Sequence, residues 1–314
     1  TKTNMAEDTL RRLLVVVCDL NPIWWGKQAV DTPEHSDKMQ PINAFLDNLL
    51  VFCNAHLMMK HSNELAVLGA TSSKSQFIYP NPENSAGEAN GEQSNKNIDG
   101  KYEHFASMND IVVENVKRTM EQENSDDANI PETSATLLSG ALSMALCYIK
   151  QAERDCPVGQ RVKARILVLK GSQDVSTQYM ATMNCIFAAQ KNNIVIDSCL
   201  LKSDSGFLQQ ASDITRGAYF KVTKMESLLQ YLLWIFLPDP TTRESLTMPG
   251  AVQIDYRAAC FCHRTLVDIG FVCSVCLSIY CQLLPRCHTC QTRFKLPTVA
   301  MGRPKKKKKD KGAD

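Results

Sequence analysis

The chain has 314 residues, of which 44% are hydrophobic and 22% charged, proportions typical of a globular protein with one large domain and one small one. Its formal charge of +2 is uneven, because residues 301–314 carry +5 and leave −3 for the rest; the folded body therefore lacks the basic footprint of an autonomous nucleic-acid binder. The first twelve residues have no apolar core and the run at 232–237 is short, so neither a signal peptide nor a membrane span is expected.

A buried strand is expected near the start of the chain. Residues 13–17 (LLVVV) are an unbroken apolar run in which β-branched residues dominate, and such a run suits a strand that is covered on both faces of a parallel sheet. Asp19 follows it, and open α/β sheets bind ligands just beyond the carboxyl ends of their strands. Asn21-Pro22 then interrupts regular structure, so Trp24 and Trp25 are expected in a loop or short turn.

The rest of the first 237 residues alternates short apolar runs with helical patterns. Strands are expected at 65–70, 77–79, 165–170, 194–200 and 218–222, and helices at 41–59, 108–121, 133–151, 177–190, 206–215 and 225–237. Residues 80–100 contain no aromatic residue, so a disordered surface insertion is expected there. The alternation predicts an α/β fold with a doubly wound, mostly parallel, Rossmann-like sheet over residues 10–237, followed by a linker at 238–255.

The segment after the first predicted strand resembles the metal-binding loop of von Willebrand A domains. That loop holds a divalent ion through an Asp-x-Ser-x-Ser motif, and hard cations need several oxygen ligands in a near-octahedral array. Asp19 is present here, but Asn21 and Ile23 stand where the serines belong. We therefore expect a vestigial ion site, in which Asp19 caps the loop by hydrogen bonding.

Two further ligands complete the ion site in von Willebrand A domains, a threonine from a later loop and an aspartate after the fourth strand. In this chain Thr133 or Thr136 could supply the threonine. Asp174 is the candidate for the aspartate, but it lies four residues beyond the end of the fourth predicted strand, farther than expected for this ligand. The sequence contains no glycine-rich phosphate loop and no nucleophilic serine elbow. A hydrolase that uses a metal ion bound at Asp19 is an alternative function, but the chain lacks some of the ligands that such an ion needs.

Seven of the thirteen cysteines lie between Cys260 and Cys290. Two Cys-x-x-Cys pairs separated by ten residues can each place two thiolates on one tetrahedral ion, which is the spacing of a structural zinc site. Four thiolates leave no open position, so the metal would stabilise the module and would not react. The predicted ligands, within a zinc finger at residues 256–298, are Cys273, Cys276, Cys287 and Cys290.

Three other cysteines and a histidine in the same stretch leave two interpretations open. They could bind a second ion, since together they supply four donors. They could also form a buried group without a metal, because the adjacency of Cys262 and His263 makes a tetrahedral arrangement awkward. The possible second set consists of Cys260, Cys262, His263 and Cys281.

The chain ends in a lysine-rich tail at residues 299–314, whose like charges repel, so disorder is expected. The tail can act as a nuclear import signal or as a loose contact to nucleic acid; otherwise it only raises solubility. The residues of the candidate import signal are Arg303, Lys305, Lys306, Lys307, Lys308 and Lys309.

Three segments of the chain, DLNPIWWGKQ, LLQYLLWIFLPD and YRAACFCHRTLVDIGFVCSVCLSIYC, point to one known family. They resemble subunit 3 of the general transcription and DNA-repair factor TFIIH, the smaller subunit that joins a von Willebrand A domain to a four-cysteine zinc finger. The resemblance covers nearly the whole chain, except residues 80–100 and the tail. Its motifs are specific, because Asn-Pro-x-x-Trp-Trp after Asp19 is not a general von Willebrand A feature.

The resemblance implies a non-catalytic structural subunit of the nuclear TFIIH core, which supports RNA polymerase II transcription initiation and nucleotide excision repair. It implies tight pairing with the larger von Willebrand A subunit, which is RING-like at its C-terminus, and membership in a core that includes two helicases. Zn²⁺ is the implied cofactor. Direct contact with DNA is expected to be weak, and neither a membrane nor a small-molecule substrate is implied. The finger lacks one cysteine pair of the two-zinc RING pattern, so ubiquitin-ligase activity is not implied.

Trp24 and Trp25 are candidate anchors for a partner, because tryptophan is over-represented at interface hot spots. Core packing is the alternative for these tryptophans and for Trp234, which lies on an apolar helix. A zinc-finger DNA-binding protein is a competing class. However, residues around the cysteine pairs, such as Phe271 and Tyr280, are apolar rather than basic, which favours contact with protein.

Overall fold

The computed structural model describes residues 10–31, 40–80, 101–126, 136–157, 159–250, 254, 256–263 and 265–294. The chain separates into two compact units, residues 1–256 and residues 257–314. Most of the segment expected as an insertion (81–100) and the whole basic tail lie outside the described residues.

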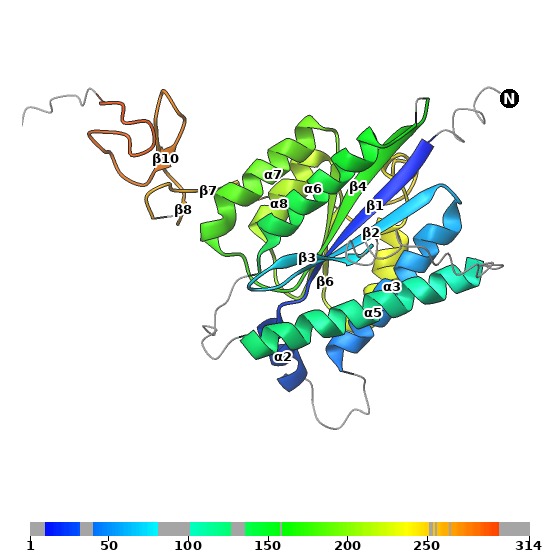
Figure 1. Ribbon diagram of the computed structural model, residues 1–314. Coiled ribbons are helices and arrows are strands. Elements are labelled where there is room, and N and C mark those ends of the chain that lie inside the picture. The colour runs from blue at the N-terminus through cyan, green and yellow to red at the C-terminus, as the bar shows by residue number, and fades with distance from the viewer. Residues whose placement is uncertain are drawn as a thin grey trace, which may run out of the picture. The chain divides into compact units, whose positions relative to one another are not determined.

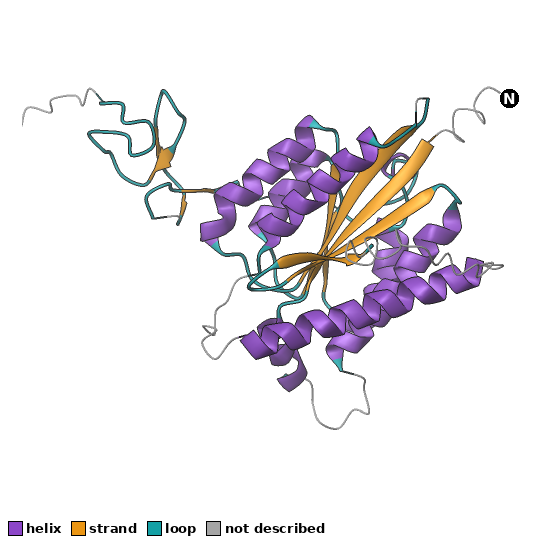
Figure 2. Cartoon of the chain, in the orientation of Figure 1, coloured by secondary structure: helices purple, strands orange, loops and turns teal. Residues whose placement is uncertain are grey.

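The first unit is built on a six-stranded sheet with the strand order β3-β2-β1-β4-β5-β6 (Figures 1 and 2). The strands are β1 Leu10–Asp19, β2 Asn63–Ala70, β3 Ser75–Tyr79, β4 Arg161–Lys170, β5 Val195–Leu201 and β6 Tyr219–Val222. Edge strand β3 runs antiparallel to β2, and the other neighbours pair in parallel. The prediction of a doubly wound, mostly parallel sheet is therefore confirmed, and the strand order reverses between β1 and β4.

Helices cover both faces of this sheet (Figure 1). One face carries α6 Leu138–Arg154, α7 Tyr179–Lys191 and α8 Gly206–Thr215. The other carries α2 Pro22–Val30, α3 Pro41–Met59, α5 Lys101–Asp126 and α9 Leu228–Tyr231, which continues as the π-helix η3 Leu232–Phe236. The short helices are η1 Ser176–Gln178, η2 Met225–Ser227 and α10 Pro240–Arg243.

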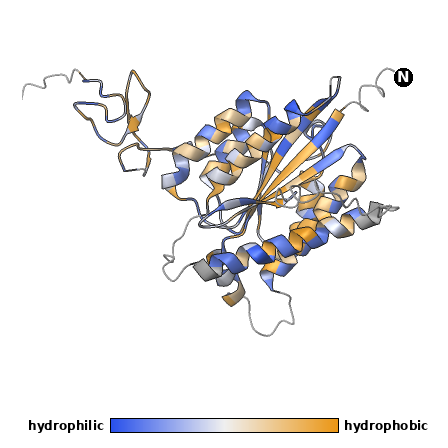
Figure 3. Cartoon of the chain, viewed as in Figure 1, coloured by the Kyte–Doolittle hydropathy of each residue, from blue (hydrophilic) through white to orange (hydrophobic). Residues whose placement is uncertain are grey.

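The core of the first unit is centred on β1. Its residues from Leu13 onward are buried, and alternate ones such as Leu14 and Val16 pack in one cluster with α3 and η3. Figure 3 shows apolar residues along the central strands, where both faces are covered. This burial on both faces explains why the strand reads as a continuous apolar run instead of an alternating one.

Helix α3 is long and apolar enough to meet a criterion for a membrane span, with a mean hydropathy of 1.2, and is the one such helix among the described residues. Its Phe45 and Phe52 are fully buried in the same cluster as β1. Packing against the sheet therefore accounts for its apolar composition.

The expectation of a loop at Trp24 and Trp25 is wrong, because both residues lie in α2. The side-chain oxygen of Asn21 accepts hydrogen bonds from the backbone N–H groups of Ile23 and Trp24 at 3.0 and 3.4 Å. Pro22 occupies the first turn, where its missing N–H has no cost. The Asn-Pro pair thus begins a helix instead of interrupting regular structure.

Two helices also differ from their expected extents. The helix expected at 108–121 runs from Lys101 to Asp126, so part of the polar segment expected to be loose is helical. Near its end, the Glu123 carboxylate accepts hydrogen bonds from the hydroxyl groups of Thr71, Ser72 and Ser73 in the turn between β2 and β3. The helix expected at 225–237 is divided into a 3₁₀ turn, an α segment and a π segment.

A buried charge cluster, which sequence analysis missed, fastens the end of the first unit to the sheet. Arg243 of α10 pairs with Asp197 of β5 through two bonds of 2.6 and 2.7 Å. Arg165 of β4 donates to the carbonyls of Phe236 and Leu237 at 2.6 and 3.0 Å, which satisfies orphan carbonyls at the end of η3. The segment expected as a linker from residue 238 thus begins with a helix that is held against the sheet.

The second unit has little regular structure. Its hairpins pair β7 Ala258–Ala259 with β8 Leu266–Val267, and β9 Phe271–Val272 with β10 Ile279–Tyr280. The buried residues of its hydrophobic cluster, among those described, are Cys273, Tyr280 and Cys287. So small a core does not supply enough burial to hold a fold, and units of this kind depend on crosslinks or metals.

Candidate functional site

Asp19 ends β1 at the point where the strand order reverses, which is where open α/β sheets bind ligands. Its Oδ1 accepts hydrogen bonds from the Asn21 N–H at 3.1 Å and the Thr136 hydroxyl at 2.8 Å. Its Oδ2 accepts from the N–H groups of Gly171 and Ser172 at 3.2 and 2.8 Å. Asp19 is only 4% exposed, and these four protein donors satisfy its buried carboxylate.

Thr136 is the threonine that the fold brings to Asp19, whereas Thr133 lies outside the described residues. The Asn21 side-chain amide donates to Thr136 Oγ1 at 3.2 Å, and that oxygen lies 3.0 Å from the Ser172 hydroxyl. The polar groups around Asp19 therefore bond to one another. Ser172 was not expected at this site, although its place just beyond β4 was a signal, because β1 and β4 end at the same edge of the sheet.

Asp174 does not join this cluster. Its carboxylate accepts hydrogen bonds from the Ser205 hydroxyl at 2.7 and 2.8 Å and from the Phe207 N–H at 3.2 Å, and it forms an ion pair with Lys170. It lies at the N-terminus of α8, where negative charge is favourable. With Ile23 in place of a serine as well, the residues near Asp19 offer fewer oxygen ligands than the ion site of von Willebrand A domains. This geometry supports the interpretation of Asp19 as a loop cap.

The three tryptophans have very different surroundings. Trp25 is 4% exposed, and its indole Nε1–H donates to the Asp19 carbonyl at 2.9 Å. Trp24 is half-buried and packs so closely on Gly171 that a Cβ there would lie 2.5 Å from its ring. Trp234, by contrast, is 70% exposed on η3. Trp25 therefore belongs to the core, and Trp234 offers the ring that is open to a partner.

The four cysteines predicted to bind zinc come together in the second unit. The ligand atoms of Cys273, Cys276, Cys287 and Cys290 all lie within 4.8 Å of one another. The Cys273–Cys290 and Cys276–Cys287 sulfur separations are 3.7 and 3.5 Å. A tetrahedral ion with Zn–S bonds of about 2.3 Å separates its sulfurs by about 3.8 Å. The arrangement therefore fits one four-coordinate zinc ion without an open position.

Each Cys-x-x-Cys pair sits in a loop with the same backbone bonds. The N–H of Cys273 donates to the carbonyl five residues on at 2.9 Å, and Cys287 does the same. The residue after each pair, Leu277 and Gln291, has a positive φ of 60° and 61°. This tight turn directs both sulfurs of each pair to one point.

Tyr280 supports this site from the side, and sequence analysis missed its role. Its hydroxyl lies 3.1 Å from Cys287 Sγ and from Thr289 Oγ1. Burial raises the pKa of Cys287, but N–H groups of Cys290 and Thr289 and the Tyr280 hydroxyl outweigh it and lower the pKa to about 5. These hydrogen bonds favour the thiolate of Cys287, which is the form that binds metal. A lone tyrosine between cysteine pairs gave only a weak signal of this role.

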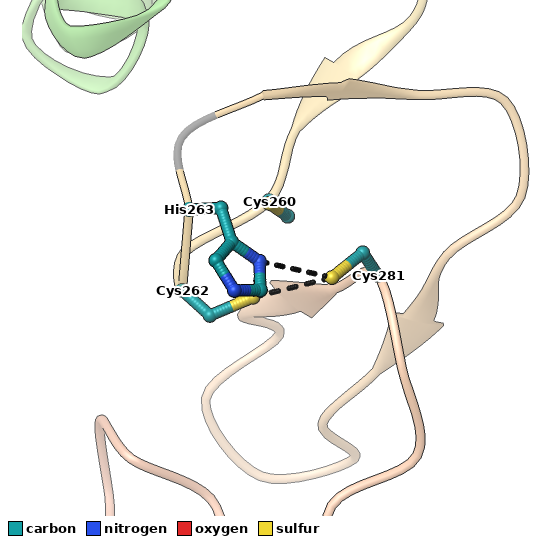
Figure 4. A group of neighbouring side chains, drawn as sticks. All are labelled: Cys260, Cys262, His263 and Cys281. Carbon is teal, nitrogen blue, oxygen red and sulfur yellow. Dashed lines mark hydrogen bonds between the residues drawn. The ribbon is translucent and has the colours of Figure 1, made fainter.

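The possible second set of ligands also comes together. Cys262 Sγ and His263 Nδ1 lie 3.5 and 3.2 Å from Cys281 Sγ (Figure 4). The ligand atoms of all four residues, Cys260 included, lie within 4.8 Å of one another. The adjacency of Cys262 and His263 is accommodated because His263 presents Nδ1, the nitrogen nearer its backbone, 3.2 Å from Cys262 Sγ.

Comparison with known proteins gives consistent results. A family model described as "Transcription factor Tfb4" matches residues 11–291. The "General transcription and DNA repair factor IIH subunit tfb4" of Schizosaccharomyces pombe is 39% identical over 284 residues, which are 90% of this chain and 88% of that protein. The "General transcription factor IIH subunit 3" of Dictyostelium discoideum is 42% identical over 260 residues, covering 81% of this chain and 68% of that protein.

A solved structure agrees with these relatives. The crystal structure of the TFIIH p34 N-terminal domain superimposes with a TM-score of 0.58 at 28% identity, and covers 72% of this chain and 98% of that chain. The sheet order and the buried Asp19 at the end of β1 accord with the von Willebrand A-like fold that the sequence predicted.

Proposed function

The chain belongs to the Tfb4 family of transcription factors, and we propose that it serves as a structural, non-catalytic subunit of the general transcription and DNA repair factor TFIIH. The observation that carries this proposal is the family match over residues 11–291, which spans both units. The first unit supports it, because the carboxylate of Asp19, at the end of β1 where the strand order reverses, accepts its hydrogen bonds from groups of the protein itself. A sheet with such a closed site serves as an interaction surface.

Zinc at the four-thiolate site is the finer part of this proposal. The sulfur separations favour a tetrahedral thiolate site. Cys273, Cys276, Cys287 and Cys290 would hold the ion, and the ion would supply folding free energy rather than reactivity.

The second unit presents the apolar surface expected of a protein-binding module. Large apolar side chains that are more than 40% exposed, among the described residues, are Leu266, Ile269, Phe271, Val272, Val275, Leu277 and Leu283. Leu277 is 70% exposed and follows the pair Cys273 and Cys276, where the turn gives it a positive φ. Its exposed apolar side chain supports contact with a partner.

We propose the larger von Willebrand A subunit of TFIIH, with its RING-like C-terminal domain, as this partner, on the strength of the family resemblance. The other core subunits, the two helicases among them, would be reached through the assembled complex. Trp234 is a second candidate anchor, because its ring is exposed on the first unit. Trp25 is buried, so replacing it tests stability more than pairing, whereas half-buried Trp24 remains a candidate anchor.

Co-expression of the full chain with that subunit tests the proposal. Leu277→Asn keeps the left-handed backbone, which asparagine adopts readily, and removes the apolar side chain; it should weaken the pairing about tenfold. Gln291→Asn is the matched control, because Gln291 has the same φ in the other Cys-x-x-Cys loop and is polar already. Wild-type protein that stays monomeric beside the partner would contradict the proposal.

We also propose nuclear localisation, since TFIIH acts in transcription. The candidate import signal at residues 303–309 lies outside the described residues. Deleting residues 303–311 should reduce nuclear accumulation of the free chain in cells; unchanged accumulation would leave the tail without this role.

A further inference from the structure

The group of Cys260, Cys262, His263 and Cys281 has no part in the four-thiolate site. Its three sulfurs and one imidazole nitrogen converge on one point from two separate stretches of chain (Figure 4). Cys260 is buried, and Cys262 and Cys281 are half-buried. Such a convergence of soft donors, without a disulfide between them, needs a physical explanation.

We propose that these four residues bind a second zinc ion, and that its ligands interleave with those of the first site. Along the chain, the first ligands of the second site (260–263) come first, followed by the pair Cys273 and Cys276 of the four-thiolate site. Cys281 then returns to the second site, and the pair Cys287 and Cys290 completes the four-thiolate site. Neither site can therefore form without ordering chain that belongs to the other.

The loop at Cys260 shares a backbone hydrogen bond with the two Cys-x-x-Cys loops. The Cys260 N–H donates to the carbonyl of Thr265, five residues on, at 2.9 Å, as Cys273 and Cys287 do with their own fifth residues. The Cys260 sulfur also lies 3.4 Å from the Thr265 hydroxyl. The two Cys-x-x-Cys loops proposed to bind zinc have this same backbone bond, and His263 stands where each of them has its second cysteine.

Strand β10 connects the two sites. Tyr280 points to the four-thiolate site, with its hydroxyl 3.1 Å from Cys287 Sγ, and the next residue, Cys281, is a ligand of the second site. The Phe261 N–H also donates to the Ile279 carbonyl at 2.8 Å, which ties the Cys260 loop to β10. A movement of β10 therefore changes the positions of side chains in both sites.

The donor set selects zinc. Thiolates favour zinc over magnesium, calcium or manganese, and three sulfurs with one imidazole form a four-coordinate structural set. The Cys262–Cys281 separation of 3.5 Å and the His263 Nδ1–Cys281 separation of 3.2 Å suit a tetrahedral ion. Four filled positions leave none for substrate, so the second ion is structural as well.

Metal analysis of the full chain tests this inference. Mass spectrometry under native conditions should find two zinc ions in the wild type and no more than one in Cys281→Ser. Cys147→Ser is the matched control, since Cys147 is an exposed free cysteine of α6, and it should retain two. One ion per wild-type chain that is lost in Cys290→Ser would overturn this inference and leave the four-thiolate proposal intact; a wild-type chain without zinc would overturn both.

Cobalt substitution gives a readout that does not depend on a variant folding. The wild type should show charge-transfer absorbance from seven Co–S bonds, counted from the seven cysteines of the two sites. Absorbance that saturates at one Co²⁺ per chain, at four-sevenths of the expected value, would overturn the inference.

Discussion

The two units of this chain obtain their order from different sources. In the first, strand β1 has the consecutive residues Leu14, Val15 and Val16 fully buried between two layers of helices, and each such side chain contributes about 1.5–3 kcal/mol. In the second, two of the three buried cluster residues are cysteines proposed to bind zinc. The first unit therefore folds by burying apolar surface, whereas the second has so small a core that the proposed metal ions must hold its cysteine loops together.

Removing the metal should separate the two units most clearly. Structural zinc contributes on the order of 10 kcal/mol to the folding of small units, so a strong chelator should unfold residues 257–294 and leave the first unit folded. All three tryptophans lie in the first unit, so tryptophan fluorescence should stay native while protease resistance of the second unit is lost. Simultaneous loss of both signals would show that the units are not independent.

The largest effect of a single substitution in the first unit is expected at Asp197. Asp197→Ala leaves Arg243 and Arg165 buried beside each other without their counter-charge, and breaking a buried pair costs about 3–5 kcal/mol. Thermal unfolding followed by tryptophan fluorescence measures this cost. Lys150→Ala removes an ion pair with Glu153 that is 42% and 32% exposed, and should change stability by less than about 0.5 kcal/mol. Equal effects of the two changes would contradict the importance of the buried cluster.

Acid should destabilise the first unit through His56. Burial lowers the pKa of His56 from 6.5 to about 4, and the positive charge of Arg165 adds to the effect. His56 binds its proton more tightly in the unfolded chain than in the folded one. The contribution of neutral His56 to the free energy of unfolding is therefore fully present above pH 6.5 and is lost as the pH falls towards 4, by roughly 3 kcal/mol in total. Urea unfolding at pH 7 and pH 4 measures the loss.

His56→Met is the control for this pH dependence, since it replaces the ring with an apolar side chain of similar size. The variant should lose less stability than the wild type between pH 7 and pH 4. If the variant loses as much stability as the wild type between pH 7 and pH 4, other groups cause the acid sensitivity.

The smallest expected effect lies in the second unit. Tyr280→Phe removes the hydroxyl group that contacts Cys287 and Thr289 but keeps the buried ring. Loss of a partner next to a metal ligand typically weakens metal binding about 10-fold to 100-fold, so zinc should pass to a competing chelator at a lower chelator concentration. Unaltered zinc affinity would mean that the ring, and not the hydroxyl, supports the site.

Much of the fold was predictable from the sequence where local signals were strong. The apolar run at 13–17 and the alternation that follows it predicted a doubly wound sheet, because strands covered on both faces must be apolar throughout. The spacing of Cys273, Cys276, Cys287 and Cys290 likewise predicted one tetrahedral cluster, since a Cys-x-x-Cys turn directs two sulfurs to one point.

Other features were not predictable, because they depend on residues far apart in the chain. Asn21-Pro22 reads equally well as a break or as a helix start, and the contact of Trp25 with Phe45 and with the Asp19 carbonyl fixes its place in the core. The pairing of Arg243 with Asp197 joins residues 46 positions apart, and no local pattern indicates which buried charges meet.

The class of the fold, the convergence of the two Cys-x-x-Cys pairs and the family could be read from the sequence alone, because each depends on short runs whose spacing has a direct physical meaning. Only the tertiary structure decided that Thr136 and Ser172 satisfy Asp19, that Trp234 is exposed while Trp25 is buried, and that His263 and Cys281 converge. These outcomes depend on where the ends of separate strands and loops meet in space, and that meeting is set by the packing of the whole sheet or unit.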